Sequence, residues 1–395
     1  MREVDVAVVG AGAAGLSLTH RLAAANAASG HPLTIALLEP PPGPGTPPER
    51  TWCFWERGPG PWDPIVAARW EHLEVVEPDG TRHRASAEPL TYKMLRSRDV
   101  DRHVRGALRE REQLTATVTA IEDGPERAVL RMRDPAGAES ELAARWVFDS
   151  RPLARAPADA TALLQHFRGW FVRTSGDAFT PDTACLMDLR TPQPRRGVSF
   201  GYLLPLSARE ALVEYTEFTR AALDDAGYTA ALRDYTGRCL DLGPFTVTAV
   251  EQGAIPMTDG RWHTRAGRRV FRIGTSGGAT RPATGYTFSG IQRQATAITT
   301  ALHHGRTPVP PVPHRPRHLA MDAVLLRALD TGRLDGADFF ARLFRRNGLP
   351  GVLDFLDGRS GLTRELALGA TTPVGPMALT TLEHAWRRGL RRRRG

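Results

Sequence analysis

The first forty residues show two apolar runs separated by a segment with helical spacing of leucines. Residues 5–9 form a short run rich in β-branched side chains, as a buried parallel strand requires. Residues 16–28 place leucines at intervals typical of a helix, and residues 33–38 form a second apolar run that ends at Glu39. This order predicts a strand, a helix and a strand, which together make one βαβ unit.

Later apolar runs predict further strands and helices. Strands are expected at 73–76, 115–121, 142–149, 169–173, 198–205, 211–216 and 270–273. Helices are expected at 100–111, at 289–304 and beyond residue 316. We interpret this order as an α/β fold in which a Rossmann-type nucleotide-binding domain carries an inserted β-sheet lobe and ends in C-terminal helices.

Two proline-rich linkers, at 40–48 and 308–316, help to divide the chain. The nucleotide-binding domain is expected to comprise residues 1–48, 91–165 and 251–310. The inserted substrate lobe is expected to comprise residues 49–90 and 166–250, and the C-terminal helices residues 311–395.

A G-x-G-x-x-G motif lies between the first strand and the first helix. Gly10 permits a tight turn, Gly12 lets the backbone approach a pyrophosphate, and Gly15 lets the helix pack closely on the strand. Ala14, within the motif, is assigned to the same site. Glu39 ends the second strand, where a carboxylate can accept hydrogen bonds from ribose hydroxyls. The motif predicts a dinucleotide site; a packing turn without a ligand is the alternative.

A second glycine-rich segment follows the late strand at 270–273. Its candidate cofactor residues are Gly274, Gly277, Gly278 and Gly285. A late loop that returns to the nucleotide-binding domain suits FAD, whose second phosphate and ribityl chain need more protein than NAD does. The prediction is therefore an FAD site, with a packing loop as the alternative.

Composition and charge exclude several classes of protein. Hydrophobic residues make up 41% and charged residues 24% of the chain, which is typical of a folded globular protein. The net charge is +9, but six arginines lie in the last nine residues, so the body is nearly balanced and no nucleic-acid-binding face is expected. No apolar stretch is long enough to span a membrane.

The N-terminus and the cysteines indicate the compartment. The first five residues include Glu3 and Asp5 where a secretory signal needs basic and then apolar residues. Cys53, Cys185 and Cys239 are widely spaced, which favours a reducing cytoplasm and predicts neither a disulfide nor a metal site.

The chain resembles one family over nearly its whole length, the FAD-dependent lycopene cyclases of carotenoid biosynthesis, and is similar to bacterial lycopene β-cyclases. The matching segments, in chain order, are 10–15, 51–56, 92–97, 148–151, 186–188, 202–207, 212–216, 255–257, 274–288 and 355–358. The resemblance implies a fold similar to that of flavin hydroxylases, with an FAD-binding domain, a sheet lobe over the flavin and C-terminal helices.

The resemblance also implies a catalytic acid. The family has a Phe-Leu-Glu-Glu-Thr-like motif, which this chain carries at 212–216 with Glu214 as the first acid and Tyr215 at the second position. Cyclisation begins when an acid protonates a terminal alkene of lycopene, and reduced FAD stabilises the cation without net redox change. The product is β-carotene, formed via γ-carotene, and NAD(P)H is the expected reductant. Without the resemblance, Glu214 would be read as a solvent-facing strand residue.

Several further residues are assigned by the same resemblance. Asp188 is expected to orient Glu214 or to accept the departing proton, with a turn-forming aspartate as the alternative. Arg98 and Asp149 are expected to contact the cofactor, although a surface salt bridge remains the alternative for Arg98. The aromatic side chains of Trp52, Phe54 and Trp55 are expected either to line a polyene tunnel or to pack in the core.

Lycopene is insoluble in water, so peripheral contact with the inner face of the membrane is expected. Phe339, Phe340, Leu343 and Phe344 lie beside arginines and fit an interfacial segment, with a buried helix as the alternative. Two other functions stay open: a flavin monooxygenase or reductase of similar fold that acts on an apolar substrate, and a non-catalytic flavin or carotenoid carrier. The sequence leaves open whether one or both ends are cyclised, and whether β, ε or γ rings form.

Overall fold

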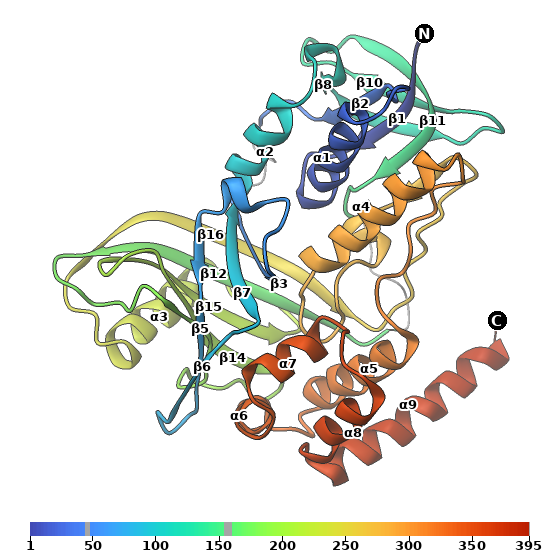
Figure 1. Cartoon of the computed structure of the whole chain (residues 1–395). Helices are drawn as coiled ribbons and strands as arrows, with labels where there is room; N and C mark the ends of the chain where they lie inside the picture. The colour runs from blue at the N-terminus through green and yellow to red at the C-terminus, as the bar shows by residue number, and fades with distance from the viewer. Residues whose placement is uncertain (44–47, 154–159, 395) are drawn as a thin grey trace.

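A seven-stranded sheet forms one end of the molecule, and β1 lies at its centre (Figure 1). Its strands are β1 (Arg2–Val9), β2 (Ile35–Glu39), β8 (Gln113–Thr115), β9 (Thr117–Glu122), β10 (Ala128–Arg133), β11 (Glu139–Asp149) and β17 (Val270–Arg272). β1 pairs in parallel with β2 and β11, and β11 pairs in parallel with β17. The carboxyl ends of these four strands therefore meet at one edge, where a nucleotide binds in such sheets. The computed structural model describes residues 1–43, 48–153 and 160–394, the last seven by their helical backbone only.

Helices cover this first sheet because its strands are apolar on both faces. They are α1 (Ala13–Ala27), α2 (Ser97–Gly106) and α4 (Phe288–His303). Val6 and Val8 of β1 pack with Leu18 of α1 and Ile298 of α4 in one buried cluster. The alternate residues Ala7 and Val9 belong to a separate cluster with β9 and β10. This alternation follows from the period of two residues in a strand.

A second seven-stranded sheet forms the inserted lobe, in the order β16-β12-β15-β14-β13-β5-β6. Its strands are β5 (His72–Val76), β6 (Arg82–Ser86), β12 (Ala162–Thr174), β13 (Thr183–Asp188), β14 (Val198–Pro205), β15 (Glu210–Thr219) and β16 (Phe245–Thr258). One face packs on α3 (Asp225–Asp234) through Val213 and Tyr215. The other face contributes Leu212 and Phe218 to the largest core cluster.

A three-stranded sheet and the C-terminal helices cover that other face (Figure 1). The small sheet contains β3 (Thr51–Arg57), β4 (Ala68–Trp70) and β7 (Leu90–Arg96). The helices are α5 (Pro316–Thr331), α6 (Gly336–Asn347), α7 (Leu349–Leu356), α8 (Leu362–Ala370) and α9 (Val374–Arg394). Short turns are η1 (Asp63–Ile65), η2 (Glu110–Glu112), η3 (Tyr235–Cys239) and η4 (Gly274–Gly277).

The strand pairings differ in three places from the division expected from sequence. β7 pairs with β3 and so continues the small sheet to Arg96, beyond residue 90. β12 begins at Ala162, and β16 remains in the lobe sheet until Thr258. A strand's own hydrophobic pattern does not identify its pairing partner, so the sequence alone could not give these pairings.

The aromatic segment in α6 was expected at a membrane interface, and that expectation is wrong. Phe339, Phe340, Leu343 and Phe344 are all buried, and they pack into the core cluster beneath the lobe sheet. Phe340 stands edge-on to Phe218 of β15, with ring centroids 6.3 Å apart. The alternative, a buried C-terminal helix, is the one observed.

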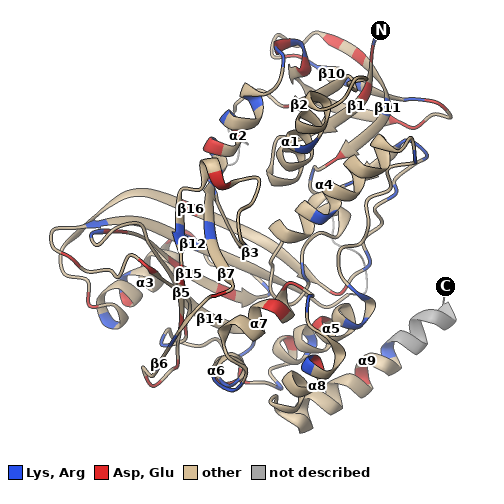
Figure 2. Cartoon of the chain, in the orientation of Figure 1, with Lys and Arg blue, Asp and Glu red and all other residues tan. Residues whose placement is uncertain are grey.

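Charged side chains of both signs are spread over the sheets and helices (Figure 2). No helix in the described part of the chain is long and apolar enough to cross a membrane. Part of the linker expected at 40–48 lies outside the described residues, as do the side chains of the final arginines.

Candidate functional site

The glycine motif forms an open cradle at the carboxyl end of β1. Gly10 has a φ of +98°, and a Cβ atom added there would lie 2.5 Å from Oγ of Ser150. A Cβ on Gly15 would lie 1.9 Å from the carbonyl oxygen of Gly10, so only glycine lets α1 approach this closely. Among the described residues, no atom lies within 4 Å of a Cβ added to Gly12. Gly12 caps α1 without a side chain, so no capping side chain competes with an anion for the first N–H groups of the helix.

Glu39 lies beside this cradle at the end of β2. The backbone N–H of Gly10 donates a 2.8 Å hydrogen bond to the carbonyl of Leu38, which fixes the two strand ends together. Burial raises the pKa of Glu39, and its ion pair with Arg105 of α2 opposes that shift. About a third of the Glu39 side chain is exposed, so its carboxylate remains accessible to a ribose.

The late glycine loop packs directly on the start of α1. Gly274 has a φ of +67°, and a Cβ added there would lie 2.8 Å from Cβ of Ala14. Gln294 of α4 accepts a hydrogen bond from the N–H of Gly274 and donates one to the carbonyl of Gly277. The structure thus joins the two glycine segments, although they are separated by more than 250 residues.

The other glycines of this loop, Gly278 and Gly285, also have positive φ, at +73° and +69°. A Cβ on Gly285 would lie 1.9 Å from Oε1 of Gln165 on β12, so this loop touches the lobe sheet as well. Arg281 anchors the loop to the C-terminal helices. It is paired with Asp322 of α5 at 3.2 Å and donates to the carbonyl of Leu356 at 2.6 Å.

These residues fit a dinucleotide with an extended second half. The buried Nε of Arg50, on the segment that leads into β3, has no hydrogen-bond partner within the described residues. Asp149 ends β11 near Gly10, but both of its carboxylate oxygens are bound by Arg151. Arg98 begins α2 with 63% of its side chain exposed, 3.7 Å from Glu49. The carboxylate of Asp149 is thus already paired with Arg151, and contact of Asp149 or Arg98 with a cofactor stays a prediction.

Glu214 lies near the middle of β15, in register with Tyr202 of β14 and Gly169 of β12. Only 6% of the residue is exposed. Oγ1 of Thr216 donates a 2.6 Å hydrogen bond to Oε1 of Glu214. Burial raises the pKa of Glu214 to about 8, the Thr216 hydrogen bond lowers it, and the nearby charge of Glu251 raises it further. The carboxyl is thus protonated at neutral pH.

Aromatic and thiol groups surround Glu214 on this face. The hydroxyls of Tyr92 and Tyr202 lie 2.6 Å apart. The pKa of Cys53 is raised to about 12, mainly by burial and in smaller part by the nearby carboxyl groups of Glu251 and Glu214. Cys53, Tyr92 and Tyr202 are therefore neutral at physiological pH. They place no ion beside Glu214, which suits a site that generates a cation and excludes water.

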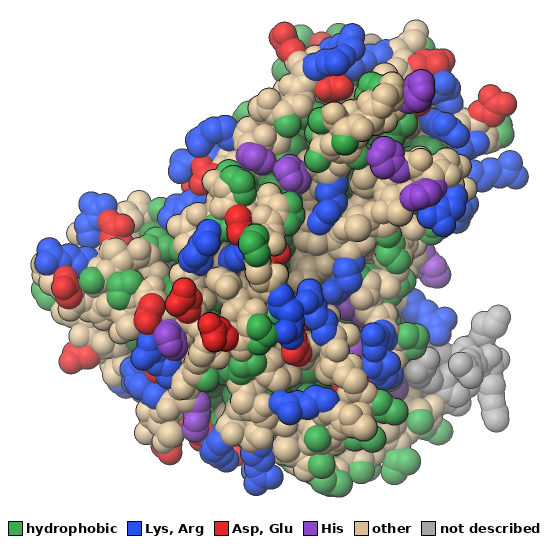
Figure 3. All heavy atoms as spheres, in the orientation of Figure 1, with side chains coloured by type: hydrophobic (Ala, Val, Ile, Leu, Met, Phe, Trp, Pro, Cys, Tyr) green, Lys and Arg blue, Asp and Glu red, His purple; other side chains and the backbone are tan. Residues whose placement is uncertain are grey.

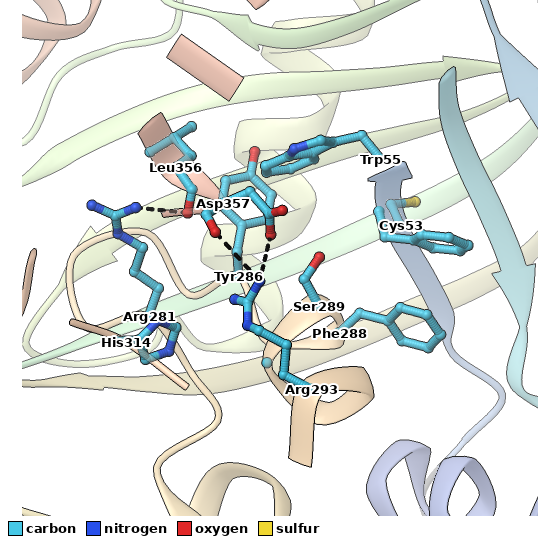
Figure 4. A pocket seen from close by; sticks show the side chains of 12 residues that line it. Cys53, Trp55, Arg281, Tyr286, Phe288, Ser289, Arg293, His314, Leu356 and Asp357 are labelled. Atoms are coloured by element: carbon cyan, nitrogen blue, oxygen red, sulfur yellow. Dashed lines mark hydrogen bonds and ion pairs between the residues drawn. The ribbon is translucent and has the colours of Figure 1, made fainter. Parts of the chain in front are cut away.

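A small pocket opens between β3, the loop before α4 and the end of α7 (Figure 4). Its walls include Cys53 and Trp55 of β3, Tyr286 and Leu356. Trp55 stands edge-on to Tyr286, with ring centroids 4.7 Å apart at 86°, and it stacks on Tyr92 at 6.2 Å. Trp55 thus connects the pocket to the aromatic side chains around Glu214.

A larger cavity of about 350 Å³ lies next to the small pocket, between α1, α4 and the segment that follows β3. Phe54, Trp55, Phe288, Ser289 and Arg293 line both spaces. The two spaces are therefore adjacent, and the larger one has a size suited to a small molecule or part of a longer one.

The three aromatic residues of β3 divide between two faces. Trp55 points toward the lobe sheet, whereas Trp52 and Phe54 pack on Phe288 of α4, with ring centroids 6.4 and 4.5 Å away. Trp55 thus fits the expectation of a tunnel wall, while Trp52 contributes to the core of the first sheet.

Asp188 lies on the opposite face of the lobe sheet from Glu214. It pairs in register with Gly201, whose other neighbour is Tyr215, on the α3 side. Arg190 binds its carboxylate at 2.6 and 2.9 Å, and the hydroxyl of Tyr235 lies 3.3 Å away. An aspartate placed in this way cannot contact Glu214, so we leave it out of the site.

Residues that the sequence analysis missed include Tyr92, Tyr202, Tyr286 and Glu251. The tyrosines lie within or beside segments that carried the family resemblance, at 92–97, 202–207 and 274–288. Glu251 lies four residues before the segment 255–257, which also carries the resemblance. Its position next to that segment is the sequence feature that could have marked it as a site residue.

Comparison with known proteins identifies relatives in both sequence and structure. The family described as "Lycopene cyclase protein" matches residues 5–382. No curated protein sequence gives a significant match. A geranylgeranyl bacteriochlorophyll reductase-like protein from Thermoplasma acidophilum is 13% identical, with a TM-score of 0.62 over 96% of this chain and 98% of its own.

Two oxygen-inserting enzymes, named as a monooxygenase and a hydroxylase, show the same likeness. The p-nitrophenol 4-monooxygenase PnpA from Pseudomonas putida DLL-E4 is 15% identical, with a TM-score of 0.59 over 98% of this chain and 99% of its own. Aklavinone-11 hydroxylase, in a complex with FAD and aklavinone, is 14% identical, with a TM-score of 0.57 over 83% of this chain and 69% of its own. At such low identity these likenesses show the fold alone, which is a Rossmann-type flavin-binding fold.

Proposed function

The chain belongs to the lycopene cyclase family, and we propose that it is a lycopene β-cyclase that closes the ψ end groups of lycopene into β-ionone rings. The observation that carries this proposal is the buried carboxyl of Glu214, whose pKa is raised to about 8 among neutral aromatic side chains. A hydrocarbon offers no polar group, so its activation requires an acid that keeps its proton until an alkene is in place.

Residues of the first sheet would hold FAD. Gly10, Gly12 and the first N–H groups of α1 would bind the pyrophosphate, and Glu39 would bind a ribose. The late loop at 274–278 would contact the remaining phosphate and the ribityl chain. Reduced FAD held by these residues would supply negative charge that favours a cation, and NAD(P)H would serve as the reductant without net consumption.

The chain's own residues would carry the proton transfer. Glu214 donates its proton to a terminal double bond of lycopene, and a tertiary carbocation results. The neighbouring double bond attacks this centre and closes the ring, and transfer of a ring proton to the Glu214 carboxylate gives a neutral product. Trp55, Tyr92 and Tyr286 exclude water, and their ring faces stabilise positive charge.

Access to lycopene would come through the membrane surface. Exposed apolar side chains gather on α8 and α9, at the lower end of the face in Figure 3. They are Leu362, Leu366, Val374, Leu379, Leu382 and Trp386. The six arginines of the last nine residues follow directly and would attract anionic lipid. We therefore place the bilayer contact here and not at α6.

A redox flavoenzyme is the second candidate, because proteins named as a monooxygenase and a reductase-like protein share the fold over nearly their whole length. Incubation with lycopene, FAD and NADPH separates the two functions. A cyclase forms cyclic carotene under anaerobic conditions, with far less than one NADPH oxidised per ring. Stoichiometric NADPH oxidation and an oxygenated or hydrogenated product would contradict the proposal. A non-catalytic carrier would bind carotene and release it unchanged.

A further inference from the structure

A second buried carboxyl lies in the same cross-strand row as Glu214. Tyr202 of β14 pairs with Glu214 of β15, Glu214 pairs with Gly169 of β12, and Gly169 pairs with Glu251 of β16. In-register neighbours in an antiparallel sheet point to the same face. Glu214 and Glu251 therefore flank a single glycine on the face that meets the small sheet.

Gly169 leaves no side chain between the two acids. A Cβ added at this position would lie 3.6 Å from Cβ and 3.7 Å from Cγ of Glu214, and 2.7 Å from Cδ1 of Leu212. The stem of Glu214 thus occupies the space that a larger residue would fill. The charge of Glu251 is one of the causes that raise the pKa of Glu214.

The two carboxyls have different hydrogen-bonding partners. Glu251 is 2% exposed and accepts hydrogen bonds from the N–H of Thr51 at 2.8 Å and from its hydroxyl at 2.9 Å. Burial raises the pKa of Glu251, and these Thr51 hydrogen bonds and the charges of Arg50 and Arg96 oppose that rise. Glu214 accepts the hydroxyl of Thr216 and has no arginine among the groups that shift its pKa. Donors and cations favour ionisation of Glu251 over that of Glu214.

The position of Tyr215 explains why the second acid comes from another strand. Neighbouring residues of a strand point to opposite faces, so position 215 faces α3. The hydroxyl of Tyr215 accordingly donates to Oε1 of Glu217, on that side of the sheet. A carboxyl at position 215 could not share a face with Glu214, whereas one at position 251 does.

We propose that Glu251 is a positioning residue of the acid site: it remains ionised, holds the proton on Glu214 and adds negative charge beside the cation. The effect on the cation rests on the proposed function, but the effect on Glu214 does not. After Glu214 has given its proton to the alkene, the ionised Glu251 also favours return of a proton to Glu214, because two adjacent carboxylates repel.

Other titratable and charged groups around the pair are few in the described residues. Those that interact with Glu214 or Glu251 are Cys53 of β3, Tyr92 of β7, Tyr228 of α3, Arg50 and Arg96. Cys53 and Tyr92 are kept neutral by burial, which raises the pKa of each. Of the groups around Glu214, Glu251 is thus the acid whose charged form is favoured by two arginines and by the two hydrogen bonds from Thr51.

Infrared titration of the flavin-free protein tests this inference directly. With isotope-labelled glutamate, the difference between wild type and Glu214→Gln isolates the protonated carboxyl band of Glu214. In Glu251→Gln this band should disappear at a lower pH than in wild type, because the repelling charge is gone. Glu251→Asp keeps a carboxyl group at this position, so its Glu214 band should disappear at nearly the same pH as in wild type. A shift that is seen in Glu251→Gln but not in Glu251→Asp therefore reports the lost charge and not a folding defect.

A matched control is Glu217→Gln, since Glu217 is a buried glutamate of the same strand on the opposite face. It should leave the Glu214 band unchanged. If the Glu214 band disappears at the wild-type pH in both Glu251→Gln and Glu217→Gln, the inference is overturned, whatever the enzyme's reaction. If the Glu214 band shifts but no cyclic carotene forms, the inference holds and the proposed function fails.

Discussion

The hydroxyl of Thr216 donates a 2.6 Å hydrogen bond to Oε1 of Glu214, two residues earlier on the same face of β15. This bond favours the ionised carboxylate and so lowers a pKa that burial has raised to about 8. Thr216→Val should therefore raise the pKa of Glu214 further. Because the protonated acid is the active form, the alkaline limb of the pH–activity profile should move to higher pH.

The control for this prediction is Asp188→Asn, which changes a buried carboxyl on the other face of the sheet. Removing the partner of Arg190 should cost about 3 kcal/mol of stability but leave the alkaline limb in place. An equal shift of the limb in both variants would show that the profile reports general loosening of the sheet and not the Thr216 hydrogen bond.

Glu214→Gln should lower the rate of ring closure by about 10²–10⁴-fold, the usual contribution of a general acid. It should also change the pH dependence of stability. The pKa of Glu214 is raised from 4.5 to about 8 on folding, so between these values the native state holds a proton that the unfolded chain has released. Wild-type stability should thus fall as pH rises through this window, by about 5 kcal/mol in all.

Urea unfolding at pH 5 and pH 9 measures this effect. The stability of wild type relative to Glu214→Gln should decrease between the two pH values, because glutamine does not titrate. A constant difference would mean that Glu214 ionises in the native state as it does in water, and the assignment of a neutral acid would be wrong.

The glycine motif allows flavin binding to be separated from folding. A side chain at Gly12 meets open space, and its φ of −84° and ψ of −172° are allowed for any residue. Gly12→Val should fold normally, but its affinity for FAD should fall by more than about tenfold, which is a loss of about 1.4 kcal/mol of binding free energy. Gly15→Ala should instead destabilise the flavin-free protein, since its Cβ would meet the carbonyl of Gly10.

Flavin fluorescence quenching and thermal melting of the flavin-free protein measure the two effects separately. If Gly12→Val bound FAD as tightly as wild type, the pyrophosphate would have to lie elsewhere.

Much of the nucleotide-binding half could be predicted because its signals are local. The strand, the glycines, the helix and Glu39 follow one another within forty residues, and the structure places them as expected. Glu214 was found through the resemblance of a short motif, while its raised pKa depends on burial that no local pattern gives.

The pairing and register of strands that are distant in the chain could not be predicted from the sequence. Gly169, Glu214 and Glu251 lie about forty residues apart, and only the pairing of β12 with both β15 and β16 brings them together. The face of Asp188 depends on a register shift between Cys185 and Asp188 in β13, which breaks simple alternation. The apolar and basic pattern of α6 suits a buried helix as well as a surface one.

The surface of α8 and α9 predicts specific loss of membrane binding. Leu366 is 66% exposed, and Leu382 lies 70% exposed on the neighbouring helix. The double variant Leu366→Glu/Leu382→Glu should weaken binding to anionic liposomes by more than about 100-fold, since each buried leucine contributes about 1.5–3 kcal/mol. Val309→Glu, at an exposed apolar residue outside both helices, is the matched control. Equal liposome binding by the double variant and this control would rule out the assigned surface.

The most direct test of proton-initiated closure is anaerobic incubation of the protein with lipid-dispersed lycopene, FAD and a reductant in D₂O. Mass spectrometry of the product should find β-carotene with one deuterium in each ring, because the proton of Glu214 exchanges with solvent before it reaches the alkene. Cyclic product without deuterium, or no cyclic product from a protein that binds flavin and lycopene, would contradict the account.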